Sequence, residues 1–168
     1  SGSAHGLEYG PVDIHGFVSQ GWLKSDKYDL WSTPTEDGTF QFSEMGLSLT
    51  AHPVRKLRVG IQLLSRDFGE IGNNEVTVDW AYGDYRFRNW LGIRAGLMKR
   101  PYGLYNQTRD IDAARTGIFL PQGLYPEITR EFYLATQGIA LYGILPGGLS
   151  YELQHGTILI DTDDGAIK

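Results

Sequence analysis

The chain has 168 residues and a formal net charge of −5, and 41% of its residues are hydrophobic. No apolar run approaches the roughly 20 residues that a membrane-spanning helix requires. The absence of cysteine excludes a disulfide scaffold and a thiolate metal site. The acidic balance, with no basic run that could follow phosphates, argues against a nucleic acid as partner.

Alternation of apolar and polar residues predicts an all-β chain with no long helix. In chain order, the expected strands span residues 12–24, 39–51, 55–66, 74–83, 86–99, 132–145 and 148–160. Short links at 52–54, 83–85 and 145–148 alternate with longer loops at 25–38 and 67–73. This alternation in length is typical of an antiparallel up-and-down meander, and outer-membrane barrels show it strongly. We expect a tail over 1–10, which begins with an expression tag, and a single β-barrel domain over 11–168.

The connection over residues 100–131 is far longer than an ordinary hairpin loop. Loops of this length in compact domains are usually functional. Its aromatic, aliphatic and charged residues are not the composition of a solvated loop tip. We therefore expect this loop to fold and pack, with a helical turn near 108–116.

The strand around residues 55–66 carries two different faces. Leu57, Val59, Ile61 and Leu63 alternate with a polar set that begins at Arg58. In a soluble sandwich the apolar face is the core, whereas in an outer-membrane barrel it meets lipid and the polar face lines water. Aromatic residues near expected strand ends favour a membrane-interface girdle, and they include Trp22, Trp80, Tyr82, Tyr85, Phe87, Trp90, Tyr142 and Tyr151.

The order of these features resembles the N-terminal half of 16-stranded bacterial outer-membrane porins, in particular phosphate-selective-porin-like proteins. Segments 42–49, 57–62, 90–99 and 101–106 carry the likeness. Within them, Arg94, Gly96, Lys99, Pro101 and Gly103 match the R-x-G-x-x-K-x-P-x-G edge that leads into the third loop of such porins. The resemblance implies a transmembrane β-barrel, partial or reduced, with about 7–8 strands in this chain and a loop over 100–131 that folds inward to narrow the pore.

The resemblance also implies a function and a site. The function is passive diffusion of small hydrophilic solutes, with anions favoured, across the bacterial outer membrane, without covalent chemistry or a cofactor. Full-length relatives are usually homotrimers. The implied charged eyelet consists of Arg58, Arg94, Asp110 and Asp112. The full set of expected pore-lining and constriction residues is Arg58, Gln62, Arg66, Arg94, Lys99, Arg100, Arg109, Asp110, Asp112 and Arg115.

Two other functions remain open at this point. A soluble lipocalin-like barrel would turn its aliphatic face toward a small hydrophobic ligand. A membrane protease or lipase barrel would gather catalytic groups at the rim of the long loops. The four histidines show no metal-ligand spacing, and no nucleophile elbow or phosphate-binding loop is present. We therefore expect no metal site and no enzymatic activity.

Overall fold

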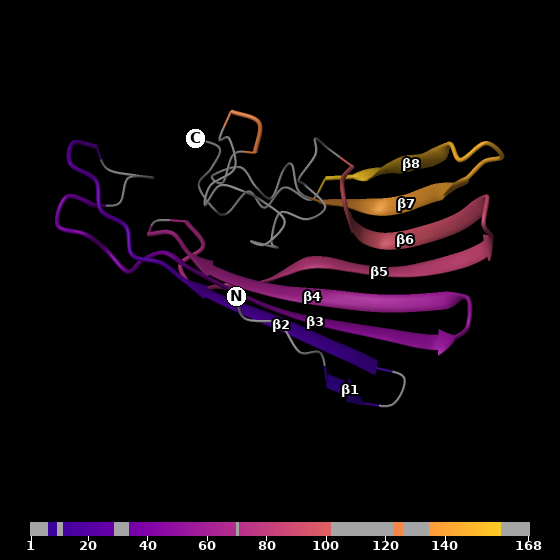
Figure 1. Cartoon of the computed structure of the whole chain (residues 1–168), viewed down its shortest axis with the longest axis horizontal. Coiled ribbons are helices and arrows are strands. Elements are labelled where there is room, and N and C mark those ends of the chain that lie inside the picture. Colours follow the sequence, from indigo (N-terminus) through magenta and orange to yellow (C-terminus); the bar gives the residue numbers. More distant parts are fainter. Residues whose placement is uncertain are drawn as a thin grey trace. The chain divides into compact units, whose positions relative to one another are not determined.

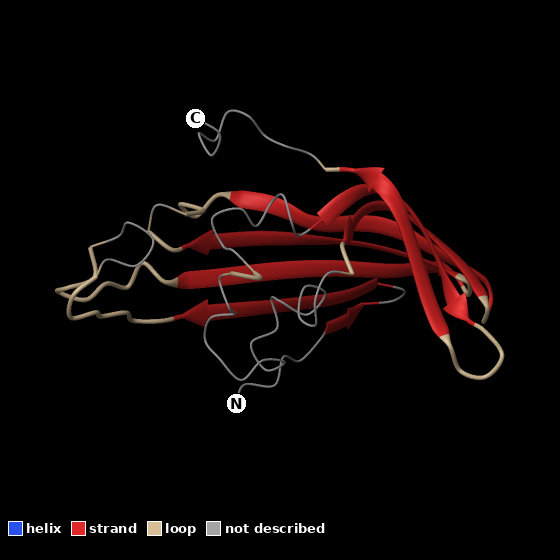
Figure 2. Cartoon of the chain, turned by 90° about the horizontal axis from the view of Figure 1, so that it is seen from above, coloured by secondary structure: helices blue, strands red, loops and turns tan. Residues whose placement is uncertain are grey.

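The computed structural model describes residues 7–9, 12–28, 34–69, 71–101, 123–125 and 135–158. These ranges contain eight strands (Figure 1): β1 (Leu7–Tyr9), β2 (Val12–Gln20), β3 (Ser43–Val54), β4 (Leu57–Asp67), β5 (Val76–Arg88), β6 (Leu91–Lys99), β7 (Ala135–Ile144) and β8 (Ser150–Thr157). Figure 2 shows strands and loops throughout the described chain. Within those ranges, no helix has the length and apolar character to span a bilayer. The all-β prediction is confirmed.

The strands form one sheet in which hydrogen-bonded neighbours follow the order of the sequence, from β1 to β8. The strand pairs with an assigned register are all antiparallel. The expected meander is therefore confirmed. Among the described residues β1 and β8 form the two edges of the sheet, so the sheet is open and the expected barrel is not closed.

Each of the seven predicted strands has a counterpart among β2 to β8, whereas β1 was not predicted. The tight turn predicted at 83–85 is wrong. These residues lie inside β5, where Gly83 pairs with Ala95 and Asp84 pairs with Arg94. A Gly-Asp pair is typical of turns, but Asp84 gains an ionic partner, Arg94 on the neighbouring strand β6, which local propensity does not count. The chain turns instead at Asn89, between β5 and β6.

Short and long connections alternate as expected, with short links at 55–56, 89–90 and 145–149. The short link predicted at 52–54 is wrong, because these residues lie inside β3. In the last of these, Gly147 and Gly148 have φ angles of 91° and 84°, a region in which glycine is favoured. In the connection between β2 and β3, Leu23 forms an antiparallel bridge with Thr39. Most of the predicted inward loop, including the helical turn expected at 108–116, lies outside the described residues.

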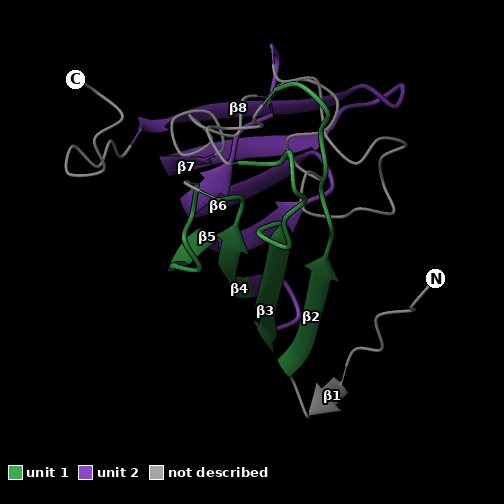
Figure 3. Ribbon diagram, turned by 90° about the vertical axis from the view of Figure 1, so that its left-hand side faces the viewer, with its two compact units in different colours: residues 1–53, 59–79 green, residues 54–58, 80–168 purple. Residues whose placement is uncertain are grey.

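Contacts divide the chain into two compact units, coloured separately in Figure 3. One comprises residues 1–53 and 59–79, and the other comprises 54–58 and 80–168. The single domain expected over 11–168 stays a prediction. Large buried hydrophobic side chains are few in the described parts of both units: Leu64 and Phe68 in the first, and Met98 and Tyr125 in the second. Most apolar side chains of the described strands are therefore not buried in a core but are at least partly exposed at the surface.

Candidate functional site

In the second unit, the strand register sorts side chains onto two faces. Directly paired residues of an antiparallel sheet share a face, and the face changes at each step along a strand. One face carries two polar rows, and the opposite face carries a largely apolar row between them. The polar rows are Arg86, Gly92, Tyr142 and Glu152, then Asp84, Arg94, Ala140 and Gln154; the apolar row is Tyr85, Ile93, Leu141 and Leu153.

Arg94 lies at the centre of the polar face and contacts two carboxylates. Its Nε donates to Asp84 Oδ2 at 3.2 Å, and its Nη1 donates to Glu152 Oε1 at 3.4 Å. The three side chains are 20%, 13% and 23% exposed, respectively, so water screens the pairs only in part. Gln154 Nε2 donates to the same Glu152 oxygen at 3.0 Å. The arrangement ties β5, β6 and β8 together through charged groups.

The Arg94 guanidinium lies over the rings of two tyrosines. Its central carbon lies 5.0 Å from the Tyr82 ring centroid and 5.1 Å from the Tyr142 ring centroid. Both distances fall within the range of cation–π attraction. The Tyr142 hydroxyl also donates a hydrogen bond to Asp84 Oδ1. We call Asp84, Arg94, Tyr82, Tyr142 and Glu152 the Arg94 cluster.

Two further arginines flank the Arg94 cluster. Arg58 Nη2 donates to the Tyr82 hydroxyl at 2.9 Å, and its guanidinium lies 5.6 Å from that ring. The Arg86 guanidinium lies 5.6 Å from the ring centroid of Tyr142. Within the described ranges neither arginine forms an ion pair. Their charges are therefore not neutralised in the way that the Arg94 charge is.

The Tyr142 ring lies against Gly92, which has no side chain to occupy the same space. Gly92 pairs directly with Tyr142, and a Cβ atom at Gly92 would lie 2.4 Å from Cζ of that tyrosine. Any other residue at this position would displace the ring from its place beside Arg94. Gly92 is therefore part of the geometry of the cluster.

The opposite face of the same strands is apolar and exposed. Ile93 and Leu141 are each 38% exposed, and Ile139 and Leu153 are 56% and 66% exposed. No second layer seals this face in the described part of the unit. Soluble monomers rarely expose contiguous apolar areas of this kind without a partner or a membrane.

The first unit shows the same division of faces. On β2 and β3, Val18 pairs with Met45, and these side chains are 80% and 46% exposed. The adjacent pair on the other face is polar and consists of Ser19 and Glu44. Val59, Ile61 and Leu63, the apolar row of β4 within this unit, are each partly exposed rather than sealed beneath a second sheet, whereas Leu64 on the other face is buried.

The ten expected pore-lining residues fall into four groups. Arg58 and Arg94 come together, because both contact the Tyr82 ring. Gln62 and Arg66 lie in the first unit, where Gln62 donates to Asp79 at 3.1 Å and Arg66 lies 6.0 Å from the Phe68 ring.

Lys99 does not join the Arg94 cluster, since alternation along β6 places it on the face opposite Arg94. Arg100 follows β6 and is partly buried. Four of the expected constriction residues lie outside the described residues: Arg109, Asp110, Asp112 and Arg115.

Sequence reasoning missed the carboxylates that neutralise Arg94. Asp110 and Asp112, which were expected to oppose the arginines from the long loop, lie outside the described residues, and the contacts observed for Arg94 are with Asp84 and Glu152. Asp84 was assigned to a turn, and Glu152 showed no spacing that singled it out. Tyr82 and Tyr142 were expected in an aromatic girdle and lie instead on the polar face. Reading 83–85 as strand would have placed Asp84 opposite Arg94.

Within the described ranges, no group of three or more histidine, aspartate or glutamate side chains is placed to hold a metal ion. The contacts of the Arg94 cluster are ionic, aromatic and hydrogen-bonded, and they provide a charged wall. Comparison with known proteins adds no identification, because no family model matches the chain and no curated protein matches it significantly in sequence.

Proposed function

We propose that this chain forms part of an outer-membrane β-barrel porin of the phosphate-selective-porin-like kind. In this proposal, the apolar face of the sheet meets lipid and the polar face lines a water-filled passage. The passage allows small hydrophilic solutes to diffuse passively, with a weak preference for anions. No covalent chemistry and no cofactor are part of this function.

The observation that carries the proposal is the contrast between the two faces of β5 to β8. Ile139 and Leu153 are more than half exposed, while Arg94 and its carboxylate partners lie on the other face and are largely shielded. Exposing an apolar row to water is unfavourable by about 25 cal/mol for each Å². The same row facing hydrocarbon carries no such cost, which is why barrel strands are apolar outward and polar inward.

The charges on the polar face support only a weak anion preference. Arg94 faces two carboxylates, Asp84 and Glu152, so that these three groups together carry one negative charge. Arg58 and Arg86 add two positive charges, which leaves a small positive excess on this wall. Rings of positive side chains favour anions in pores, and a small excess gives a small effect.

The edges of the sheet support association with further strands. The outer sides of β1 and β8 have no strand partner among the described residues, and an unpaired edge is a template for pairing. A homo-oligomer, with lipid around it, is therefore part of the proposal. The soluble lipocalin-like alternative requires the apolar face to line an enclosed cavity, and the exposure of Ile139 and Leu153 does not favour it.

The proposal is tested by recording the full chain in planar bilayers under a salt gradient. We expect stepwise conductance and a reversal potential that indicates a slight anion preference. Arg58→Glu should move the reversal potential toward cation selectivity, since Arg58 is exposed and forms no ion pair that the substitution would break.

The matched control is Arg55→Glu, which places the same charge change in the short turn between β3 and β4. Its effect on the reversal potential should be smaller. Folded protein that stays soluble without detergent and produces no conductance would refute the channel and favour a soluble binding protein.

A further inference from the structure

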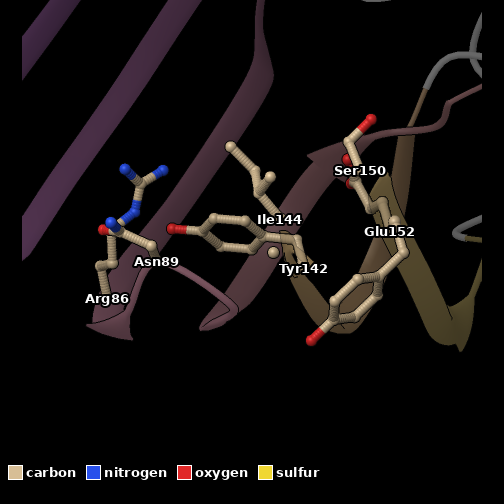
Figure 4. Close-up of a pocket in the computed structure, with 8 residues that line it drawn as sticks. Arg86, Asn89, Tyr142, Ile144, Ser150 and Glu152 are labelled. Carbon is tan, nitrogen blue, oxygen red and sulfur yellow. The ribbon is translucent and has the colours of Figure 1, made fainter. Parts of the chain in front are cut away.

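A pocket of about 270 Å³ opens beside the Arg94 cluster, near the turns that follow β5 and β7 (Figure 4). Its volume lies just below the roughly 300 Å³ at which pockets for drug-sized ligands begin, which suits a small occupant. The Tyr142 ring lies between two sets of polar groups, with Arg86 and Asn89 on one side and Ser150 and Glu152 on the other (Figure 4).

The first set offers hydrogen-bond donors and a positive charge. In the described part of the chain, no carboxylate pairs with Arg86. A guanidinium presents a planar fork of donors that matches a carboxylate in a bidentate arrangement. The backbone at Asn89 is fixed, because its carbonyl accepts a hydrogen bond from the Ile144 N–H at 3.0 Å. Its side-chain amide lines the pocket beside Arg86 and supplies a further donor.

The second set suits hydroxyl groups. Glu152 uses Oε1 for both of its observed contacts, with Arg94 and Gln154. The described residues thus leave Oε2 to accept from a ligand hydroxyl. Ser150 adds a hydroxyl that can donate or accept. The Tyr151 hydroxyl is already engaged, since it donates to the Trp90 carbonyl at 2.7 Å.

Between the two sets, the Tyr142 ring and Ile144 provide apolar surface. An aromatic face of this kind can pack against the C–H side of a sugar ring. We propose that this pocket binds a monosaccharide acid, with its carboxylate on Arg86 and Asn89 and its hydroxyls on Ser150 and Glu152. The inference goes beyond the channel function and does not depend on it.

The test measures binding of three probes to the full chain by calorimetry, without a bilayer: glucuronate, glucose and acetate. Glucuronate should bind more tightly than either of the others, because it alone reaches both polar sets. Arg86→Gln should weaken glucuronate binding by about tenfold, the usual effect of losing a charge-assisted hydrogen bond. Arg55→Gln, an exposed arginine outside the pocket, should leave binding unchanged.

A second variant separates the sugar contacts from the charge. Ser150→Ala should weaken glucuronate binding by a few-fold and leave acetate binding unchanged, and circular dichroism should confirm that each variant keeps its β-structure. Equal affinities for glucuronate and acetate, or an Arg86→Gln variant that binds like the unmodified chain, would overturn the proposal. Because no membrane is involved, failure here is distinguishable from failure of the channel.

Discussion

The two faces of β5 to β8 in the second unit share one backbone but differ in how their side chains are surrounded. On the polar face, Arg94 contacts two carboxylates and two tyrosine rings, so its charged group is surrounded by partners. On the apolar face, Ile139 and Leu153 remain more than half exposed. The comparison teaches that the charges of the Arg94 cluster are paired with one another, whereas the apolar row of the opposite face is left without a covering layer among the described residues.

The largest expected effect comes from placing a charge on the apolar face. Under the lipid-facing proposal, Ile139→Arg should destabilise the protein folded in vesicles by about 2–4 kcal/mol, the cost of an arginine near the bilayer midplane. The free energy of unfolding is measured by urea titration in lipid vesicles. If the face meets water instead, the change should stay within about 0.5 kcal/mol.

A matched control for this comparison is Thr157→Arg. Thr157 lies on the same face, but at the end of β8. Near the membrane interface, the cost of an arginine falls to about 0–1 kcal/mol. Equal losses at positions 139 and 157 would contradict a face that crosses a bilayer.

A smaller loss of stability is expected when a larger side chain is introduced on the polar face beside Tyr142. Gly92→Val would place atoms where the Tyr142 ring lies and displace it from Asp84 and Arg94. Overpacking of this kind costs about 1–3 kcal/mol of unfolding free energy, measured by denaturant titration. Gly123→Ala is the control, because a Cβ atom at Gly123 meets nothing within 4 Å. An unchanged stability for Gly92→Val would show that the ring position is not fixed.

The smallest expected effect is the coupling energy between Arg94 and Asp84. It distinguishes a specific contact between the two side chains from a general effect of removing charge. In a double-mutant cycle, Arg94→Gln and Asp84→Asn should show a coupling energy of about 0.5–3 kcal/mol, as for residues in one ionic network. The unfolding free energies of the four proteins give this value. Arg88→Gln combined with Asp84→Asn is the control, and its coupling should be about 0.5 kcal/mol or less. Equal coupling in both cycles would contradict a specific pair.

Much of the fold could be predicted because strand alternation is local. The repeat of apolar residues from Leu57 onward, and the glycines of the turn after β7, carry their signal in a few neighbouring positions. The wrong prediction of a turn at 83–85 arose because it, too, used only neighbouring residues. Gly83 and Asp84 are turn residues by propensity, and only their pairing with β6 keeps them in a strand.

The site was less accessible from the sequence than the fold. Arg58 and Arg94 were chosen by parity, and they do contact a common tyrosine. The partners of Arg94 come from positions 10 and 58 residues away in the chain. Spacing along one strand contains no information about such distant partners.

The sequence by itself determined that the chain forms strands with one apolar and one polar face. Successive side chains of a strand point to opposite faces, so a two-residue alternation of apolar and polar residues can be recognised in the sequence. The tertiary structure decided which charges meet. Cross-strand register places Asp84 opposite Arg94 and Gly92 opposite Tyr142, and register depends on pairing between distant segments. It also decided that the aliphatic side of the second unit stays uncovered, which no local pattern specifies.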